Sequence, residues 1–136
     1  MPQDNERISL YRQLDNMERV EQTEEFRTML RDRFGTIPNV TEELIRIVPL
    51  RLAAKRLGIE RLVLKEGKMR AYFVSADNKA YYNSPAFGRV IRYAQQNIRR
   101  CQLTQVKGRN LMLMNSVPDV STALDILTAM TRLESV

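Results

Sequence analysis

The stretch RLVLKEGKMRAYFV, residues 61–74, decides the fold class, because the periodicity of its apolar residues changes there from helical to extended. Two short runs rich in β-formers, RLVLK and MRAYFV, flank the turn pair Glu66-Gly67 and predict a β-hairpin. Further along the chain, CQLTQVK and NLMLMN flank Gly108 and predict a second hairpin. Since short hairpins join antiparallel strands, we expect a small antiparallel sheet.

A helix is predicted after each hairpin. Ser84 and Pro85 supply an N-cap and a first-turn proline, and apolar residues follow at helical spacing as far as Ile98. Pro118 or Asp119 opens a last helix. The second half of the chain therefore follows the order ββαββα, with helices packed on the sheet.

Three helices are predicted before the first strand. The first covers residues 6–17, the second is capped by Thr23 and ended by Gly35, and the third begins at Asn39. Pro49 lies inside the third helix, where its ring removes one backbone hydrogen bond, so we expect a kink or a break there.

These elements predict an α+β fold, in which a three-helix section precedes a small antiparallel sheet built from two hairpins. Residues 1–6 are interpreted as a tail and residues 7–136 as a single α+β domain. Within that domain, residues 7–58 form the helical part and residues 59–136 the ββαββα part.

Composition limits the class of protein further. Apolar residues make up 43% of the chain and charged residues 28%, which is ordinary for a globular protein in solution. Cys101 has no second cysteine to pair with, and no apolar run is long enough to span a membrane or to serve as a secretory signal. We therefore expect a cytoplasmic protein with no membrane partner.

Most catalytic and metal-binding constellations are missing from the sequence. The chain has no histidine and one cysteine, which excludes Ser-His, Cys-His and zinc sites built from this chain alone. Gly67-Lys68 is followed by Met69 rather than Ser or Thr, so a phosphate-binding loop is not encoded. We expect no catalytic residue, no metal site and no cofactor in this chain.

The net charge of +6 lies entirely in the second half, because residues 1–58 carry ten basic and ten acidic side chains whereas residues 59–136 carry twelve and six. A group of basic residues at helical spacing and just beyond could follow a phosphate backbone, with nearby tyrosines stacking on bases. The same pattern also fits a solvated helix face, which we favour because no readout motif accompanies it. The group consists of Arg89, Arg92, Arg99, Arg100, Lys107 and Arg109.

A second candidate site is the charged triplet Arg31, Asp32 and Arg33 in the last turn of the second predicted helix. Arginines are favourable there because they face the negative end of the helix dipole, whereas Asp32 costs about 0.3–1 kcal/mol by the same argument. Thr28, Thr36 or an external cation are the candidate partners for Asp32. From the residues alone, a structural role and a protein-docking role are about equally supported.

Three motifs resemble the C-terminal domain of the bacterial transcription-repair coupling factors, Mfd. They are ISLYRQL at 8–14, MLRDRFGTIP at 29–38 and LRLAAKRLGIERL at 50–62; the remainder resembles that family only in its order of elements. The resemblance implies a domain taken from a larger multidomain protein, which is an ATP-driven DNA translocase that displaces stalled RNA polymerase. In such a protein the motor, and its ATP, would lie upstream of this chain.

The resemblance also implies a role for the triplet. In that family the domain docks on a UvrB-like N-terminal module of the same protein and masks the surface that recruits the repair protein UvrA. The docking element of the family places its Asp and Arg on Asp32 and Arg33, its leading Glu on Met29, and an apolar residue on Arg31. We therefore expect an autoinhibitory docking surface at these four residues, with one ion pair fewer than in the family pattern.

Overall fold

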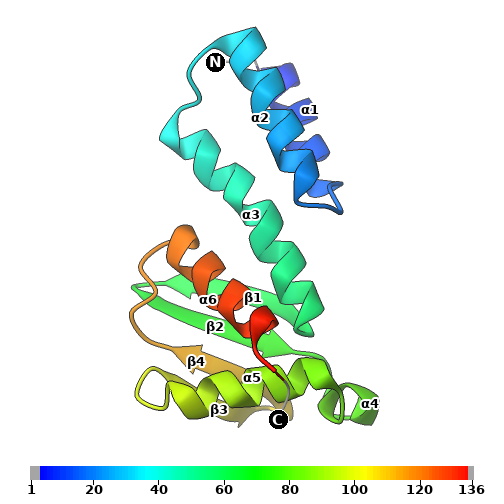
Figure 1. The fold of residues 1–136 in the computed structure, drawn as a ribbon, viewed down its shortest axis with the longest axis vertical. Helices are drawn as coiled ribbons and strands as arrows, with labels where there is room; N and C mark the ends of the chain where they lie inside the picture. Colours follow the sequence, from blue (N-terminus) through cyan, green and yellow to red (C-terminus); the bar gives the residue numbers. More distant parts are fainter. Residues whose placement is uncertain (1–3, 135–136) are drawn as a thin grey trace. The chain divides into compact units, whose positions relative to one another are not determined.

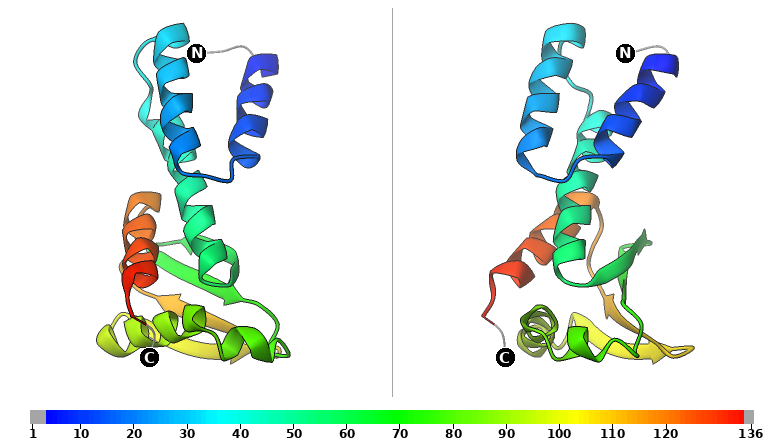
Figure 2. Two further views of the ribbon diagram at one scale, coloured as in Figure 1. Left: turned by 45° about the vertical axis from the view of Figure 1, so that its right-hand side comes forward. Right: turned by 90° about the vertical axis from the view of Figure 1, so that its right-hand side faces the viewer.

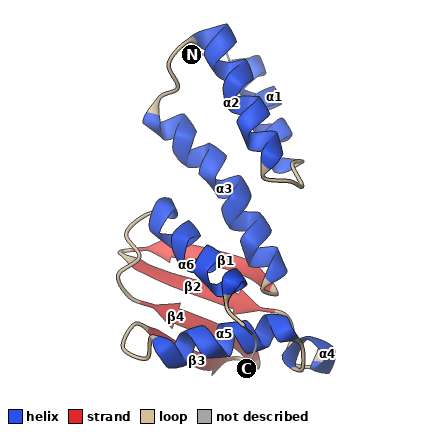
Figure 3. Cartoon of the chain, viewed as in Figure 1, coloured by secondary structure: helices blue, strands red, loops and turns tan. Residues whose placement is uncertain are grey.

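The computed structural model describes residues 4–134 and confirms the α+β fold class (Figures 1 and 3). The predicted ββαββα order is present, with one additional short helix. The elements are α1 (Asp4–Asp15), α2 (Glu21–Phe34), α3 (Asn39–Arg56), β1 (Ile59–Lys65), β2 (Lys68–Phe73), α4 (Lys79–Tyr82), α5 (Pro85–Gln96), β3 (Cys101–Val106), β4 (Arg109–Met114) and α6 (Val120–Arg132). The chain divides into two compact units between Leu52 and Ala53, within α3.

The N-terminal unit has a core of its own, built by α1, α2 and the first part of α3 (Figure 2). Apolar residues three or four positions apart on each helix face inward, as helical periodicity requires. The buried members are Leu10, Leu14, Met17, Phe26, Leu30, Ile45 and Val48. Because α1 begins at Asp4, residues 4–6 form its first turn instead of part of the expected tail, and residues 1–3 lie outside the described chain.

The start of α2 differs from the prediction. The helix begins at Glu21, so Thr23 lies inside it and is not its N-cap. The Thr23 hydroxyl is buried and donates a hydrogen bond of 2.6 Å to the carbonyl of Val20. The Gln22 side chain instead accepts hydrogen bonds from the N–H groups of Glu18 and Arg19, both at 2.9 Å, and so organises the turn before the helix.

Helix α3 continues through Pro49, so the alternative of two separate helices is wrong. A proline inside a helix costs roughly 3 kcal/mol. Ile45, Val48 and Leu50 are nevertheless all buried on either side of it, and burying three such side chains contributes about 1.5–3 kcal/mol each. Tertiary packing therefore outweighs the local preference to break.

The C-terminal unit contains one antiparallel sheet with the strand order β1-β2-β4-β3. Both predicted hairpins form, and the pairing of β2 with β4 joins them. Each hairpin turn has two central residues at positive φ, Glu66 and Gly67 in the first and Lys107 and Gly108 in the second. This is the turn geometry whose twist suits two-residue hairpins, which explains why each turn contains a glycine.

Helices α5 and α6 lie on the same face of the sheet (Figure 2, right). That face contributes buried residues such as Met69, Phe73 and Met112, which alternate along their strands with residues directed to the opposite face. The predicted cap of α5 is present, since the Ser84 hydroxyl accepts from the N–H of Phe87, and Asp119 caps α6 by accepting from the N–H of Thr122 at 2.8 Å. No helix in residues 4–134 is long and apolar enough to cross a membrane.

Helix α4 was not predicted, and it places two tyrosines in an aromatic cluster. Phe73, Tyr81, Tyr82 and Phe87 have ring centroids 4.8–6.3 Å apart. The Tyr82 hydroxyl donates to the carbonyl of Val74 at 2.5 Å, and the Tyr81 hydroxyl donates to the carbonyl of Leu57. These two tyrosines are therefore occupied within the fold instead of being presented to bases.

Alkaline pH is expected to destabilise the C-terminal unit through Tyr81. Burial, with a smaller contribution from Tyr82, raises the pKa of Tyr81 well above its usual value of 10.0. Because the folded pKa exceeds the unfolded one, this contribution to stability is complete below about pH 10 and is lost as the pH rises further. Urea unfolding should show that the free energy of unfolding falls more between about pH 9 and about pH 11 for the native chain than for Tyr81→Phe. Equal decreases in the two proteins would contradict this role of Tyr81.

Candidate functional site

The end of α2 holds the predicted triplet in a defined backbone geometry. Gly35 has a φ of 82°, and its N–H donates to the carbonyl of Arg31 at 2.9 Å, which closes the last turn. Positive φ is natural for glycine and ends a helix in this position. Phe34 packs against the N-terminal core immediately before it. The triplet is thus fixed between a buried aromatic ring and a terminated helix.

Asp32 and Arg31 are exposed, and neither side chain makes a hydrogen bond or an ion pair with any residue in the range 4–134. The Thr28 hydroxyl, one of the predicted partners of Asp32, donates instead to the carbonyl of Glu24 at 3.1 Å. Asp32 also lies at the unfavourable end of the helix dipole. Among residues 4–134 this carboxylate therefore has no hydrogen-bond or ion-pair partner, and it is available to a cation outside the described chain.

Arg33 is held loosely. Its guanidinium lies 5.1 Å from the ring centroid of Phe34 and 3.9 Å from a carboxylate oxygen of Glu6. Both side chains of that ion pair are about half exposed, 55% for Arg33 and 49% for Glu6, so the pair contributes at most about 1 kcal/mol. Arg33 can exchange Glu6 for another carboxylate at little cost.

Met29 differs from the other three candidates, because it is partly buried and packs against the N-terminal core. The structure therefore brings Arg31, Asp32 and Arg33 together on the surface and directs Met29 inward. A thioether in this position supports the helix that carries the triplet.

Sequence reasoning missed the residue that ties the site to the rest of its unit. Arg27 pairs with Glu24 at 2.5 Å and with Glu42 of α3 at 3.1 Å, and the Arg27 side chain is only 16% exposed. Glu42 is in the first turn of α3, where a carboxylate is favourable on its own because it faces the positive end of the helix dipole. The spacing of Glu24 and Arg27 was a detectable signal, whereas the pairing across fifteen residues required the fold.

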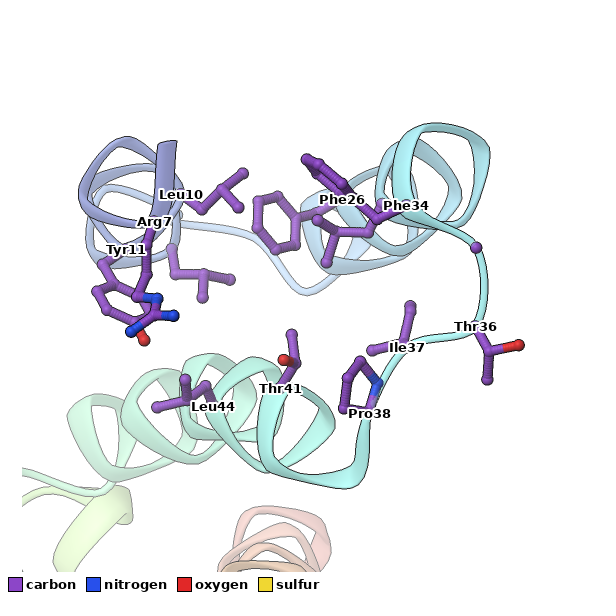
Figure 4. Close-up of a pocket in the computed structure, with 13 residues that line it drawn as sticks. Arg7, Leu10, Tyr11, Phe26, Phe34, Thr36, Ile37, Pro38, Thr41 and Leu44 are labelled. Carbon is purple, nitrogen blue, oxygen red and sulfur yellow. The ribbon is translucent and has the colours of Figure 1, made fainter. Parts of the chain in front are cut away.

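An apolar cavity of about 50 Å³ lies in the N-terminal unit next to the triplet (Figure 4). Leu10, Phe26 and Leu44 are among the side chains that line it, while Arg7 and Tyr11 lie together at one end. Gly35 and Pro38 also border it. The cavity contains no group that would carry out chemistry, so we interpret it as imperfect packing behind the triplet.

The basic group in the second half does not form one surface. Arg89 donates to the carbonyl of Leu133 at 3.0 Å, and Arg100 donates to the carbonyls of Asn115 and Ser116 at 3.2 and 3.0 Å. These guanidinium groups satisfy backbone carbonyls of the fold.

The other four members are spread over separate places. Arg92 is on α5, Arg99 precedes β3, Lys107 is in a hairpin turn, and Arg109 extends from β4. Arg109 donates to the carbonyl of Phe73 at 3.2 Å and also pairs with Glu60. Its side chain belongs to the face of the sheet opposite α5.

The lone thiol is equally unsuited to chemistry. Cys101 is buried, and burial raises the pKa of its thiol, which keeps it in the unreactive protonated form. Among residues 4–134, no three His, Cys, Asp or Glu side chains gather closely enough to hold a metal ion.

Comparison with known proteins identifies the family. The family model described as the TRCF domain matches residues 1–84. This chain belongs to the TRCF domain family. The match includes all three motifs at 8–14, 29–38 and 50–62 and the whole charged triplet, so the resemblance proposed from sequence is confirmed.

The curated relatives of this TRCF domain are transcription-repair-coupling factors. The chain is 30% identical to the protein of Haemophilus influenzae over 88 residues and 31% identical to that of Escherichia coli over 83 residues. These alignments cover 65% and 61% of this chain, and in both cases only 7% of the relative. The chain thus matches a small part of much longer proteins.

A solved structure extends the likeness to the whole fold. The crystal structure of the C-terminal domain of a transcription-repair coupling factor superimposes with a TM-score of 0.71, covering 95% of this chain and 81% of that one at 16% identity. At this identity the comparison shows the fold alone. It includes the second ββα section, which the family model does not reach.

Proposed function

We propose that this TRCF domain is a regulatory docking module of a transcription-repair coupling factor. In this proposal the end of α2 docks on a UvrB-like module of the same protein and masks the surface that recruits UvrA. The remainder of that protein is an ATP-dependent DNA translocase that removes stalled RNA polymerase in the cytoplasm. The observation that carries the proposal is the exposed carboxylate of Asp32, which has no partner among residues 4–134.

The electrostatics of the triplet favour docking over a structural role. An aspartate at the negative end of a helix dipole, with no local partner in the described chain, lowers the stability of the isolated domain slightly. An arginine on a partner surface would pair with Asp32 and offset its unfavourable interaction with the helix dipole. Arg31 and Arg33 on either side would then select for carboxylates flanking the partner arginine.

Rigidity supports the same proposal. The triplet is fixed by Gly35 and Phe34 at one end, and Arg27 connects α2 to Glu42 of α3. Binding therefore requires little ordering of the backbone, which lowers its entropic cost.

The change Asp32→Ala tests the proposal. Removing one partner of a desolvated charge pair typically costs at least about 2 kcal/mol, so we expect a loss of roughly 30-fold in affinity for the UvrB-like module. The measurement is calorimetric titration of this chain with that module, followed by UvrA binding to the full protein, which should increase.

The matched control is Asp15→Ala. Asp15 is also an exposed aspartate at the end of a helix, α1, so the net charge changes equally. Equal affinities of the native chain and Asp32→Ala would refute the docking role of the triplet. A similar loss in both variants would point to a non-specific charge effect and would refute it as well.

The alternative function, nucleic-acid binding through the group from Arg89 to Arg109, is less well supported. Arg89 and Arg100 are engaged with backbone carbonyls, and Arg109 is paired with Glu60. A phosphate-binding surface needs its cations free and side by side.

A further inference from the structure

The sheet of the C-terminal unit has an outer face, opposite to the face that carries α5 and α6 (Figure 2, right). Paired residues of neighbouring strands point to the same side, so the register defines this face. The outer sheet face consists of Arg61, Val63, Lys65, Lys68, Arg70, Tyr72, Gln102, Thr104, Val106, Arg109, Leu111 and Leu113.

The outer sheet face is strongly basic. Five of its twelve residues are arginine or lysine and none is acidic, although Glu60, at the irregularity in β1, pairs with Arg109. Lys65, Lys68 and Arg70 are exposed and make no ion pair with any residue between 4 and 134. Lys65 and Lys68 face each other across the first hairpin, which brings two like charges together at a cost to the isolated fold.

Beside these cations, the face has a stacked pair. The guanidinium of Arg61 lies 5.6 Å from the ring centroid of Tyr72, and the two residues are partners in the pairing of β1 with β2. Leu111 is the partner of Tyr72 on β4 and is buried. A planar guanidinium and an aromatic ring are the groups on which proteins stack unpaired bases.

We propose that the outer sheet face binds single-stranded nucleic acid. Lys65, Lys68 and Arg70 contact successive phosphates, and one or two bases stack on Arg61 and Tyr72. Duplex DNA is disfavoured, because its bases are stacked on each other and cannot reach the pair. An acidic protein would satisfy the cations but would leave the Arg61–Tyr72 pair without a function.

This inference does not rest on the docking role of Asp32. The residues of the outer sheet face lie between 61 and 113, whereas the docking triplet is at 31–33. It also replaces the predicted basic group as the nucleic-acid surface, since the two sets share Arg109 alone.

The experiment is a fluorescence anisotropy titration of a labelled 20-nucleotide oligothymidine with the full chain at about 50 and about 200 mM salt. With three phosphates contacted, the affinity is expected to fall roughly 20-fold over this range. The variant Lys65→Gln/Lys68→Gln/Arg70→Gln should bind at least about 10-fold more weakly at low salt and show a flatter salt dependence.

The matched control is Arg92→Gln/Arg99→Gln/Lys107→Gln, which removes the same charge from residues outside this face and should bind like the native chain. Tyr72→Leu tests stacking and is expected to weaken binding about 5- to 100-fold, while Tyr72→Phe keeps the ring and the affinity.

Three outcomes would overturn the proposal. They are the absence of binding at low salt, equal losses in the two triple variants, and an affinity unchanged by Tyr72→Leu. The last result would reassign the face to acidic proteins. Circular dichroism of each variant establishes that the loss is not caused by unfolding.

Discussion

Replacing Gly58 with alanine is expected to lower the free energy of unfolding by about 3 kcal/mol. Gly58 follows α3, has a φ of 77°, and presents its Cα to the ring of Tyr81. An added Cβ would overlap three ring carbons of Tyr81. The left-handed backbone costs about 1–2 kcal/mol for a residue with a Cβ, and forcing an extra methyl into packed surroundings adds about 1–3 kcal/mol.

The ring of Tyr81 has little freedom to yield. It is in contact with Phe73, Tyr82 and Phe87, and its hydroxyl donates to the carbonyl of Leu57, the residue before the glycine. Moving the ring would break that hydrogen bond and open the aromatic cluster. The close approach of Gly58 is therefore part of how the helix end is attached to the sheet within the C-terminal unit.

The variant Gly108→Ala separates the cost of the left-handed backbone from the cost of the overlap with Tyr81. Gly108 has a φ of 75°, close to that of Gly58, but an added Cβ would meet nothing within 4 Å. The free energy of unfolding is expected to fall by about 1 kcal/mol in this variant. Urea unfolding monitored by tyrosine fluorescence reports on this unit, because four of the five tyrosines lie after residue 53. Equal losses in the two variants would show that the contact with Tyr81 does not form.

Phe73→Ala is expected to be still more damaging, at about 4 kcal/mol. Phe73 is fully buried on the face of the sheet that carries the helices, and its ring lies 5.9 Å from that of Phe87 and 6.3 Å from that of Tyr81. Truncation leaves a cavity at the centre of the aromatic cluster. The rigid sheet and α5 cannot collapse into it, so both the transfer and cavity costs apply.

Tyr72 provides a control for Phe73→Ala and also tests which residues lie on each face of the sheet. Tyr72 precedes Phe73 on β2 and points to the outer sheet face, where it is half-buried. Tyr72→Ala should cost about 1–2 kcal/mol, well below Phe73→Ala. Equal losses would mean that the two faces of the sheet are assigned incorrectly, and the proposed nucleic-acid surface would be wrong with them.

Much of the fold was predictable because its signals are local. The turn pairs Glu66-Gly67 and Lys107-Gly108 define two hairpins, and Ser84 with Pro85 defines the start of α5. One error occurred where tertiary packing outweighs a local preference, and another where a different nearby side chain organises the turn. Pro49 stays inside α3 because buried neighbours hold the helix, and Thr23 lies inside α2 because Gln22 organises the turn before it.

The candidate site also combines features that local sequence signals predicted with features that only the structure showed. The dipole argument and the DRFG motif singled out Asp32, and the structure finds it exposed with no partner in the range 4–134. Whether the triplet docks remains a prediction. The ion pair of Arg27 with Glu42 was not predictable, since each residue had a sufficient local explanation.

The sequence alone determined the α+β class, the hairpins, the family and the unusual place of Asp32, because periodicity, turn chemistry and dipole effects act over a few residues. Only the tertiary structure decided which cations are free. Arg89, Arg100 and Arg109 are engaged by carbonyl or carboxylate groups up to forty-nine residues away, while Lys65, Lys68 and Arg70 are gathered on one open face of the sheet. The sequence gives the charge of a side chain. Whether that charge is available to a binding partner depends on which distant acceptors the fold places beside it.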